Sequence, residues 1–467
     1  MKLCKIYNRI RYCIILIFLC IFIVNNAFSF NAAFKSHKLS NGLELITYKN
    51  SKVPLVSICI AIKGGSITEN LENNGLTHLW EHMFFKGNAL YPTQNDFLKY
   101  MRKIGAFWNG TTSVEKVDYF ITIPSSFLEE GLKIMSYAIS TPLLDEKELV
   151  KERKVVEEEY HISYSKPKNL AYELSIVLIY ENLHYLVDPL GKREVILNAT
   201  TQQLLDIKHK IMVPKNSALI ITGDFDEGTI LNVVEKYFNK WANPTNWTTP
   251  KLYEISGFSK TQKIIMVHDD FKTSEILLFF KGPSVKFNTN DTYIADVLMT
   301  MLNSKISKIY KHFIESSLVQ YINVSYYTQS YSPLLLVNIG ANANQITYIE
   351  KHIFKEIQNF MNTDYFSLKE LDIAKNKIIL NYKLDYDKPS QLFHKLGFWW
   401  AIAGIDYYQN YLDNIKNVSL DDVRMFVKKY FINQNYVLLK LIPSAEAKKF
   451  GFKDNSKPII DKYKLGY

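Results

Sequence analysis

Residues 78–82 of the chain read His78-Leu79-Trp80-Glu81-His82, inside a segment (74–85) whose apolar spacing predicts a helix. On a helix, residues four apart lie on one face, about one turn from each other. His78 and His82 can therefore direct both imidazoles at one metal ion. Glu81 lies at the edge of the same face, where its carboxylate can reach an activated water molecule without binding the metal.

This pattern points to catalytic zinc. Two imidazoles and one carboxylate with an open fourth position form the ligand set of a catalytic zinc ion. Zinc lowers the pKa of water toward about 7, and a nearby carboxylate can accept the proton during attack on a peptide carbonyl. We therefore expect one zinc ion (Zn²⁺) per chain, with His78 and His82 as ligands and Glu81 as general base. A structural histidine pair on a helix is the alternative.

The third ligand must come from another segment. Residues 151–160 read KERKVVEEEY and are predicted to be helical. Glu152 and Glu159 are seven residues apart, on the same helix face as Val155 and Val156. These apolar neighbours indicate that the face points into the protein. A buried carboxylate needs a partner, and a metal ion is a suitable one. Glu159 is the preferred third ligand, with Glu158 left open as an alternative. Glu152 would orient a histidine ligand.

The N-terminal segment has the composition of a secretory signal peptide. Basic residues precede an apolar run from Cys13 to Val24, which is shorter than the roughly 20 residues of a membrane-spanning helix. Small residues at Ala27 and Ser29 provide a cleavage site, so residues 1–29 are predicted to be removed and the protein to be exported. After cleavage no stable membrane span is expected. An uncleaved anchor is the alternative.

The cysteine content indicates the cellular compartment of the protein, and the net charge indicates whether nucleic acid is a partner. Only Cys59 lies outside the predicted leader, so the exported chain would have no internal disulfide. This feature and the short leader favour a bacterial periplasm, with secretion as the alternative. The formal net charge is +10, but no basic cluster is interleaved with aromatic residues, so nucleic acid is not predicted as a partner.

Two segments of the chain, residues 196–219 and 415–438, resemble each other. In both, a polar residue (Thr200 or Ser419) precedes a helical apolar pattern, a break and a β-branched run. This order predicts an N-cap, a helix, a turn and a strand. The offset between the segments is half the length that follows residue 29, which indicates a duplication. Two unrelated units of this common type are the alternative.

Strands and helices mix within the first predicted half as one compact unit, so the fold class is α+β. Strands are predicted at 43–48 and 55–62, ahead of the histidine-bearing helix. Breakers in residues 241–260 place the join between halves there. The expected domains are therefore residues 30–248, which carry the zinc motif, and residues 249–467, which lack it.

The chain resembles the pitrilysin/insulinase/mitochondrial processing peptidase family, the inverted zincins. HLWEHMFFKG at 78–87 is similar to the zinc helix of this family, and KERKVVEEEY is similar to the later helix whose glutamate completes the site. Residues 105–112 resemble a family strand beside the zinc. The resemblance covers the first half of the chain well and the second half weakly.

The resemblance implies two similar domains, each an antiparallel sheet covered by helices, and a homodimer or heterodimer in which four domains form a chamber. It implies a zinc endopeptidase acting on oligopeptides or unfolded segments, which lie extended against a sheet edge. Asn109 would lie near the bound peptide, and Tyr321 would stabilise its carbonyl oxygen. Ser317 stands where the family often has an Arg, so this stabilisation would be reduced. We therefore expect a partner subunit to supply the pair, which would make this chain the zinc-bearing half of a heterodimer. A non-catalytic scaffold or regulatory subunit, and a processing peptidase with a defined cleavage site, are the alternatives.

Overall fold

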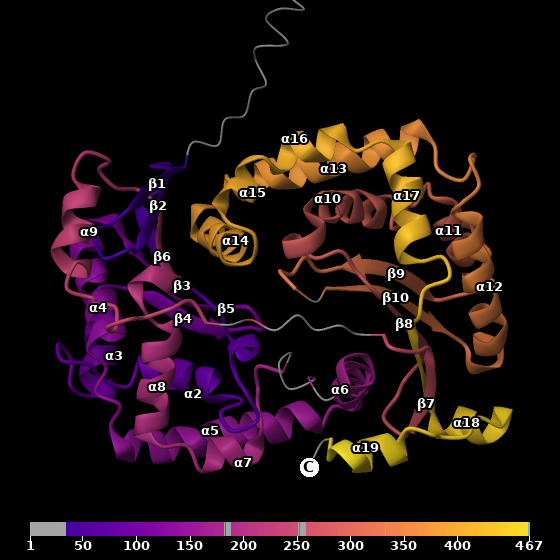
Figure 1. The fold of residues 1–467 in the computed structure, drawn as a ribbon, viewed down its shortest axis with the longest axis horizontal. Coiled ribbons are helices and arrows are strands. Elements are labelled where there is room, and N and C mark those ends of the chain that lie inside the picture. Colours follow the sequence, from indigo (N-terminus) through magenta and orange to yellow (C-terminus); the bar gives the residue numbers. More distant parts are fainter. Residues whose placement is uncertain are drawn as a thin grey trace, which may run out of the picture. The chain divides into compact units, whose positions relative to one another are not determined.

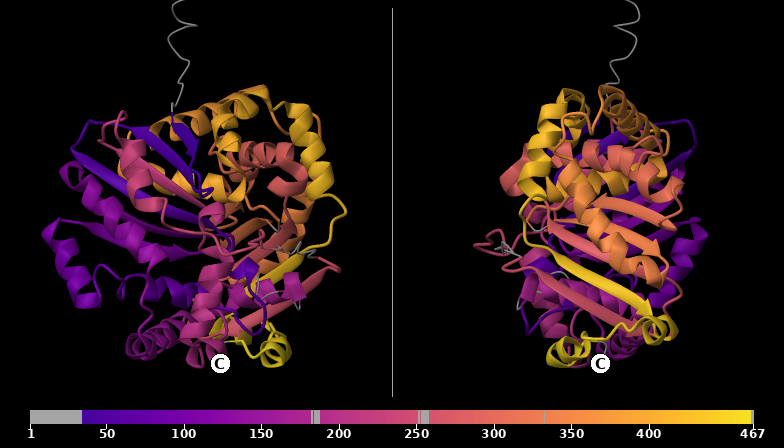
Figure 2. Two further views of the ribbon diagram at one scale, coloured as in Figure 1. Left: turned by 60° about the vertical axis from the view of Figure 1, so that its left-hand side comes forward. Right: turned by 90° about the vertical axis from the view of Figure 1, so that its right-hand side faces the viewer.

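The computed structural model of the protein describes residues 34–181, 183, 188–250, 252, 258–331 and 333–465. The predicted leader, residues 1–29, lies outside the described residues. Residues Lys35–Tyr467 form one unit by their contacts. This unit contains two β-sheets, each with its own helices (Figures 1 and 2), so the predicted fold of two α+β domains is confirmed.

The first sheet has six strands in the order β1-β2-β6-β3-β5-β4. Their bounds are β1 Lys35–Lys38, β2 Glu44–Lys49, β3 Leu55–Lys63, β4 Phe107–Thr112, β5 Lys116–Pro124 and β6 Ser217–Gly223. Neighbouring strands are antiparallel except β2 and β6, which are parallel. The predicted strands at 43–48 and 55–62 are confirmed as β2 and β3. β4 lies at one edge of this sheet, which leaves its outer side open to a further strand.

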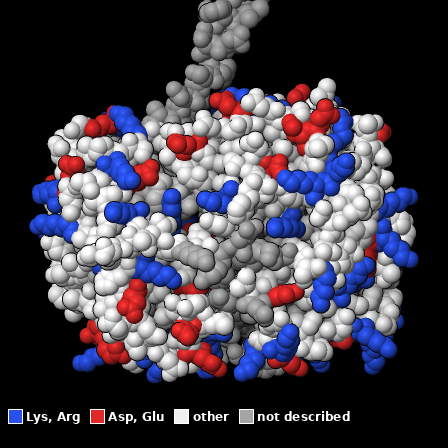
Figure 3. Space-filling view, viewed as in Figure 1, with Lys and Arg blue, Asp and Glu red and all other residues white. Residues whose placement is uncertain are grey.

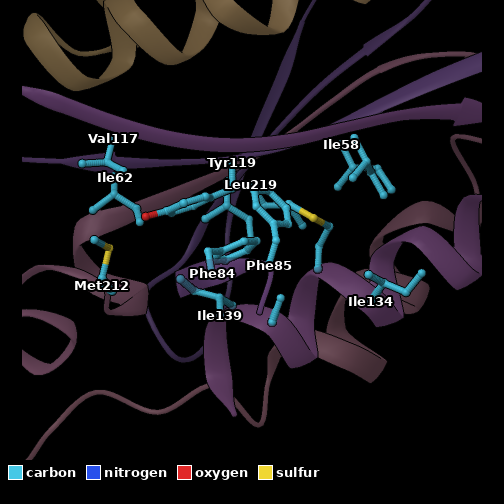
Figure 4. Packing of buried hydrophobic residues seen from close by; sticks show 14 of the residues in the cluster. Ile58, Ile62, Phe84, Phe85, Val117, Tyr119, Ile134, Ile139, Met212 and Leu219 are labelled. Carbon is cyan, nitrogen blue, oxygen red and sulfur yellow. The ribbon is translucent and has the colours of Figure 1, made fainter. Parts of the chain in front are cut away.

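The helices of the first half, apart from α6, cover one face of this sheet (Figure 1). They are α2 Leu76–Phe84, α3 Gln94–Lys103, α4 Leu128–Ser140, α5 Glu146–Tyr164, α7 Arg193–Leu197, α8 Thr201–Ile211 and α9 Ile230–Phe238. α6 Pro167–Tyr180 lies against the second sheet. α2 and the sheet meet in the core, where the rings of Phe84 and Tyr119 stack with centroids 3.8 Å apart (Figure 4). This apolar contact fixes the helix that carries both histidines.

The second sheet repeats the order of the first. Its strands run β7-β11-β8-β10-β9, and β7 and β11 form the only parallel pair between its described strands. Their bounds are β7 Gln262–His268, β8 Ser274–Lys281, β9 Tyr321–Tyr326, β10 Leu334–Ala341 and β11 Val437–Pro443. The same order and the same parallel pair recur in β2-β6-β3-β5-β4, as a duplicated unit requires.

The helices of the second half are α10 Val285–Leu302, α11 Lys308–Tyr310, α12 Ile346–Asn359, α13 Leu368–Asp385, α14 Pro389–Ile402, α15 Ile405–Gln409, α16 Tyr411–Asn417, α17 Leu420–Tyr430, α18 Ser444–Phe450 and α19 Lys457–Tyr463. The helices and strands predicted within 196–219 and 415–438 are confirmed as α8 with β6 and α17 with β11. The described residues between α9 and β7 form no helix or strand. The domain boundary at 248/249 stays a prediction.

Each half contributes one helix to the sheet of the other half (Figure 1). α6 shares a hydrophobic cluster with β7 and β11, in which Leu174 and Val177 join Ile264 and Leu439. α14 packs on β3 and β6 of the first sheet. A Cβ placed on Gly397 of α14 would lie 3.3 Å from Ala61, so the helix approaches that sheet closely. The two halves therefore hold each other through buried apolar contacts.

The length of the helices and the distribution of surface charge indicate how the protein could interact with membranes and nucleic acids. Among the described residues, no helix combines the length and the apolarity needed to cross a bilayer. On the face shown in Figure 3, basic and acidic side chains are interspersed. That face therefore shows no continuous basic surface of the kind that nucleic acids require.

Candidate metal centre

α2 starts at a buried carboxylate. The first N–H groups of a helix have no partner within the helix. Glu69, which is 1% exposed, accepts hydrogen bonds from the backbone N–H of Gly75 at 2.7 Å and of Thr77 at 2.8 Å. This anchor and the apolar face of the helix hold α2 in one position, so His78, Glu81 and His82 have a fixed base.

The structure brings His78 and His82 together with Glu159 of α5. Glu159 Oε2 lies 3.7 Å from His78 Nε2 and 3.6 Å from His82 Nε2. One ligand atom from each of the three residues lies within 4.8 Å of the others. Ligands at about 2.0–2.1 Å from one tetrahedral ion are roughly 3.3 Å apart. The donor atoms and their spacing therefore fit a zinc ion.

Glu152 lies at the ring nitrogen of His82 that faces away from Glu159. Its Oε2 is 3.2 Å from His82 Nδ1, and its Oε1 accepts a hydrogen bond from Lys86 Nζ at 2.6 Å. A carboxylate on the second ring nitrogen fixes the tautomer and the orientation of a ligand histidine. Lys86 was not identified from the sequence, because it lies beyond the end of α2, where helix spacing no longer specifies which side chains meet.

The carboxylate of Glu81 is positioned by edge strand β4. Thr112 of β4 donates a hydrogen bond from Oγ1 to Glu81 Oε2 at 2.6 Å. A Cβ on Gly110 would lie 2.8 Å from Glu81 Cγ, so only glycine leaves room for this carboxylate. No sequence motif singles out Thr112 or Gly110. The two residues are two positions apart on β4, and residues with this spacing lie on the same face of a strand, here the face toward α2.

Burial and neighbouring charges shift the pKa values of these groups. Burial, and the charge of His82, lower the pKa of His78 to about 4. Burial opposes the charge on His82, but hydrogen bonds to Glu152 and Glu159 outweigh it and raise the pKa of His82 to about 9. Burial also raises the pKa of Glu81. A more basic carboxylate is a better proton acceptor near neutral pH.

The remaining predicted residues lie elsewhere. Glu158 is exposed on α5. Val155 is 43% exposed, so the inward face of this helix is narrower than expected and centres on Val156 and Glu152. Asn109 is exposed on edge strand β4.

Tyr321 is not part of the cluster. It lies on β9 in the second sheet, and its ring fills the space beside Gly340, where a Cβ would meet it at 2.2 Å. Its side chain hydrogen-bonds to Glu275 and Asn338, which lie on neighbouring strands of the same sheet.

Comparison with known proteins places this arrangement in a family. Residues 45–182 match the family model described as Insulinase (Peptidase family M16), and residues 198–378 match the model described as Peptidase M16 inactive domain. The chain belongs to the peptidase M16 family. The resemblance inferred from the zinc helix is thereby confirmed, and the candidate metal centre of this M16 chain lies in the part that matches the first model.

Two relatives extend over most of the M16 chain. A protein of Rickettsia felis named as an uncharacterized zinc protease is 25% identical over 405 residues, which are 85% of this chain and 95% of the relative. The uncharacterized zinc protease YmxG of Bacillus subtilis is 26% identical over 88% of this chain and 98% of its own length. The family and these names support a zinc metalloprotease.

Solved structures share the fold. A protease from Helicobacter pylori superposes with a TM-score of 0.79 at 20% identity, covering 88% of this chain and 100% of that chain. The periplasmic protease PqqL from Escherichia coli gives a TM-score of 0.76 at 17% identity and covers 92% of this chain, but only 50% of the PqqL chain is matched. The fold of this chain therefore corresponds to half of PqqL.

Proposed function

We propose that this M16 chain is a zinc-dependent endopeptidase that hydrolyses oligopeptides or unfolded segments. One zinc ion per chain is held by His78, His82 and Glu159. The observation that supports this best is the convergence of two rings from α2 and one carboxylate from α5, with their ligand atoms within 4.8 Å of one another. A structural histidine pair on a helix would not by itself require a third ligand group from another helix beside Glu81.

A bound zinc ion would polarise the carbonyl of the scissile peptide bond and make water more acidic. Glu81 accepts the proton of the attacking water and returns it to the departing amine, as a general base and then a general acid. Thr112 holds the carboxylate of Glu81 in place for this transfer. Glu152 keeps the ring of His82 oriented.

The substrate peptide adds to edge strand β4 as a further strand. Main-chain hydrogen bonds to a sheet edge bind peptides with little demand on their sequence. Asn109 is exposed on that strand and is positioned to contact the peptide. Tyr321 would act on the substrate carbonyl only within a dimer, homomeric or with a related subunit, because no described contact links it to the metal centre of its own chain.

The proposed compartment is the bacterial periplasm, with secretion as the alternative. Residues 1–29 act as a cleaved signal peptide in this proposal. The fold likeness to PqqL, a protein named as periplasmic, and the free Cys59 support it. Edman sequencing of the exported protein tests the predicted cleavage after Ser29.

Peptide hydrolysis by the purified chain, with metal content measured in the same preparation, tests the function. One equivalent of zinc, with cleavage of several unrelated peptides that a chelator stops, is expected. A protein without stoichiometric zinc would instead be a non-catalytic scaffold or regulatory subunit. Cleavage at one site in one substrate would indicate a processing peptidase.

A further inference from the structure

A large cavity lies between the edge of the first sheet and the helix contributed by the second half. Its volume is about 910 Å³, and its walls come from β4, β5, α14 and the segment after β9. Five aromatic side chains supply the apolar part of the lining: Phe107, Phe120, Tyr327, Phe398 and Trp399. Hydroxyl, amide and basic side chains complete the walls. Phe398 and Tyr327 meet edge to face with centroids 5.4 Å apart. Such walls favour an apolar or aromatic occupant.

The charged groups at this cavity already have partners. Lys116 forms an ion pair with the buried carboxylate of Asp118, and His394 Nδ1 lies 3.4 Å from the same group. Lys395 pairs with Asp385 at 3.5 Å. An occupant with its own charge would compete with these pairs, whereas an uncharged ring would leave them intact.

The register of β4 places this cavity opposite the metal centre. Phe107 is paired with Thr122 and Asn109 with Phe120, and cross-strand partners share one sheet face. That face lines the cavity. Thr112, which contacts Glu81, belongs to the alternate set of β4 side chains and points to the other face. A strand added to β4 would therefore present alternate side chains to the cavity and to the metal centre.

We infer that this cavity binds an uncharged aromatic side chain of the peptide, at a position whose sequence neighbours face the metal centre. The inference rests on the proposed function, since it requires a peptide paired with β4. It assigns substrate selection to residues of both halves: Phe107 and Phe120 from the first sheet, and Tyr327, Phe398 and Trp399 from the second half. Specificity then depends on how α14 lies against the first sheet.

Binding tests the cavity without turnover. The probes are two labelled ten-residue peptides that differ only in a central Phe or Ser, bound to zinc-loaded full-length Glu81→Gln protein and followed by fluorescence anisotropy. Phe107 and Tyr327 are 68% and 62% exposed, so Phe107→Ala and Tyr327→Ala leave the core unchanged. Each should weaken the Phe peptide about three- to ten-fold, the scale of a lost aromatic contact, and leave the Ser peptide unchanged.

The matched control is Phe450→Ala, which removes an aromatic ring that is 41% exposed on α18. It should change neither affinity, and thermal melting should show all variants folded. Equal weakening of both peptides, or no weakening in either cavity variant, would overturn the assignment. In the first case the rings support the bound strand without selecting a side chain.

Cleavage mapping separates this inference from the proposed function. When the Phe is moved one residue along the host peptide, the site cut by the unsubstituted protein should move one residue with it, and Phe107→Ala should abolish this coupling. Cuts that ignore the Phe would overturn the cavity assignment while leaving the peptidase intact. No zinc-dependent cleavage of any peptide would refute the proposed function, and the anisotropy difference would still decide the cavity.

Discussion

Each half contains a corresponding pair of helices beside a corresponding edge strand. In the first half the pair is α2 and α5, beside β4. In the second half it is α10 and α13, beside β9. Their apolar positions correspond: the buried residues are Leu79, Trp80, Met83 and Phe84 in α2, and Val297, Leu298, Met301 and Leu302 in α10. The polar positions do not. Asp296 stands at the position of His78, Met299 at that of Glu81 and Thr300 at that of His82.

The second pair keeps a cavity where the first has its candidate metal centre. This cavity is about 500 Å³ in volume and is lined by Asp296 and Thr300 of α10 and by Asn381 of α13. Tyr411 donates a hydrogen bond to Asp296 at 2.6 Å. The comparison shows that apolar packing builds the helix pair, while a few polar substitutions decide whether it can hold zinc.

Removing the general base should have the largest effect. Glu81→Gln keeps the shape of the side chain but cannot accept a proton, so we expect kcat/KM for a peptide substrate to fall by about 10²–10⁴ with zinc content unchanged. Asp296→Asn, at the corresponding helix in the second half, should stay within about two-fold of the parent rate. Unchanged turnover of Glu81→Gln would contradict the role given to Glu81.

Removing the third ligand should abolish tight metal binding. Glu159→Gln replaces an anionic ligand by a neutral amide, and we expect zinc affinity, measured by competition with a chromogenic chelator, to fall more than about 100-fold, beyond the loss typical of an outer partner. Asn381→Ala is the control in the second half. Glu158→Gln is the control on α5 and should have no effect; a comparable loss there would reassign the third ligand to Glu158.

Disturbing the partner of His82 should have an intermediate effect. Glu152→Gln removes the charge that orients the ring, and such outer partners contribute about 10–100-fold to metal affinity. Because Glu152 also accepts a hydrogen bond from Lys86 at 2.6 Å, Lys86→Met should weaken zinc binding in the same direction but less. Full affinity in Glu152→Gln would show that packing alone orients His82.

The sequence could predict what local spacing determines. His78, Glu81 and His82 lie within one helical turn, so their common face follows from helix geometry alone. The strands β2 and β3 and the paired segments with α8 and α17 were likewise readable from periodicity.

What the sequence could not predict depends on contacts between distant segments. The roles of Thr112 and Gly110 require the register of β4 beside α2, which no local pattern specifies. The exchange of α6 and α14 was also missed, because an apolar helix shows that it must be covered but not which sheet covers it. The cavity beside β4 exists only through that exchange.

The smallest predicted effect tests whether the two similar halves unfold as one unit. Thr200 and Ser419 occupy corresponding N-caps, and each forms a capping box, with Gln203 in α8 and with Asp422 in α17. Thr200→Ala and Ser419→Ala should each lower the free energy of unfolding by about 1 kcal/mol, because each leaves N–H groups at a helix start without their partner. Urea unfolding followed by circular dichroism measures both.

Since α6 and α14 tie each half to the other, we expect one unfolding transition, shifted equally by either variant, and an additive shift in the double variant. Two transitions, each responding to one variant, would mean that the exchanged helices do not couple the halves.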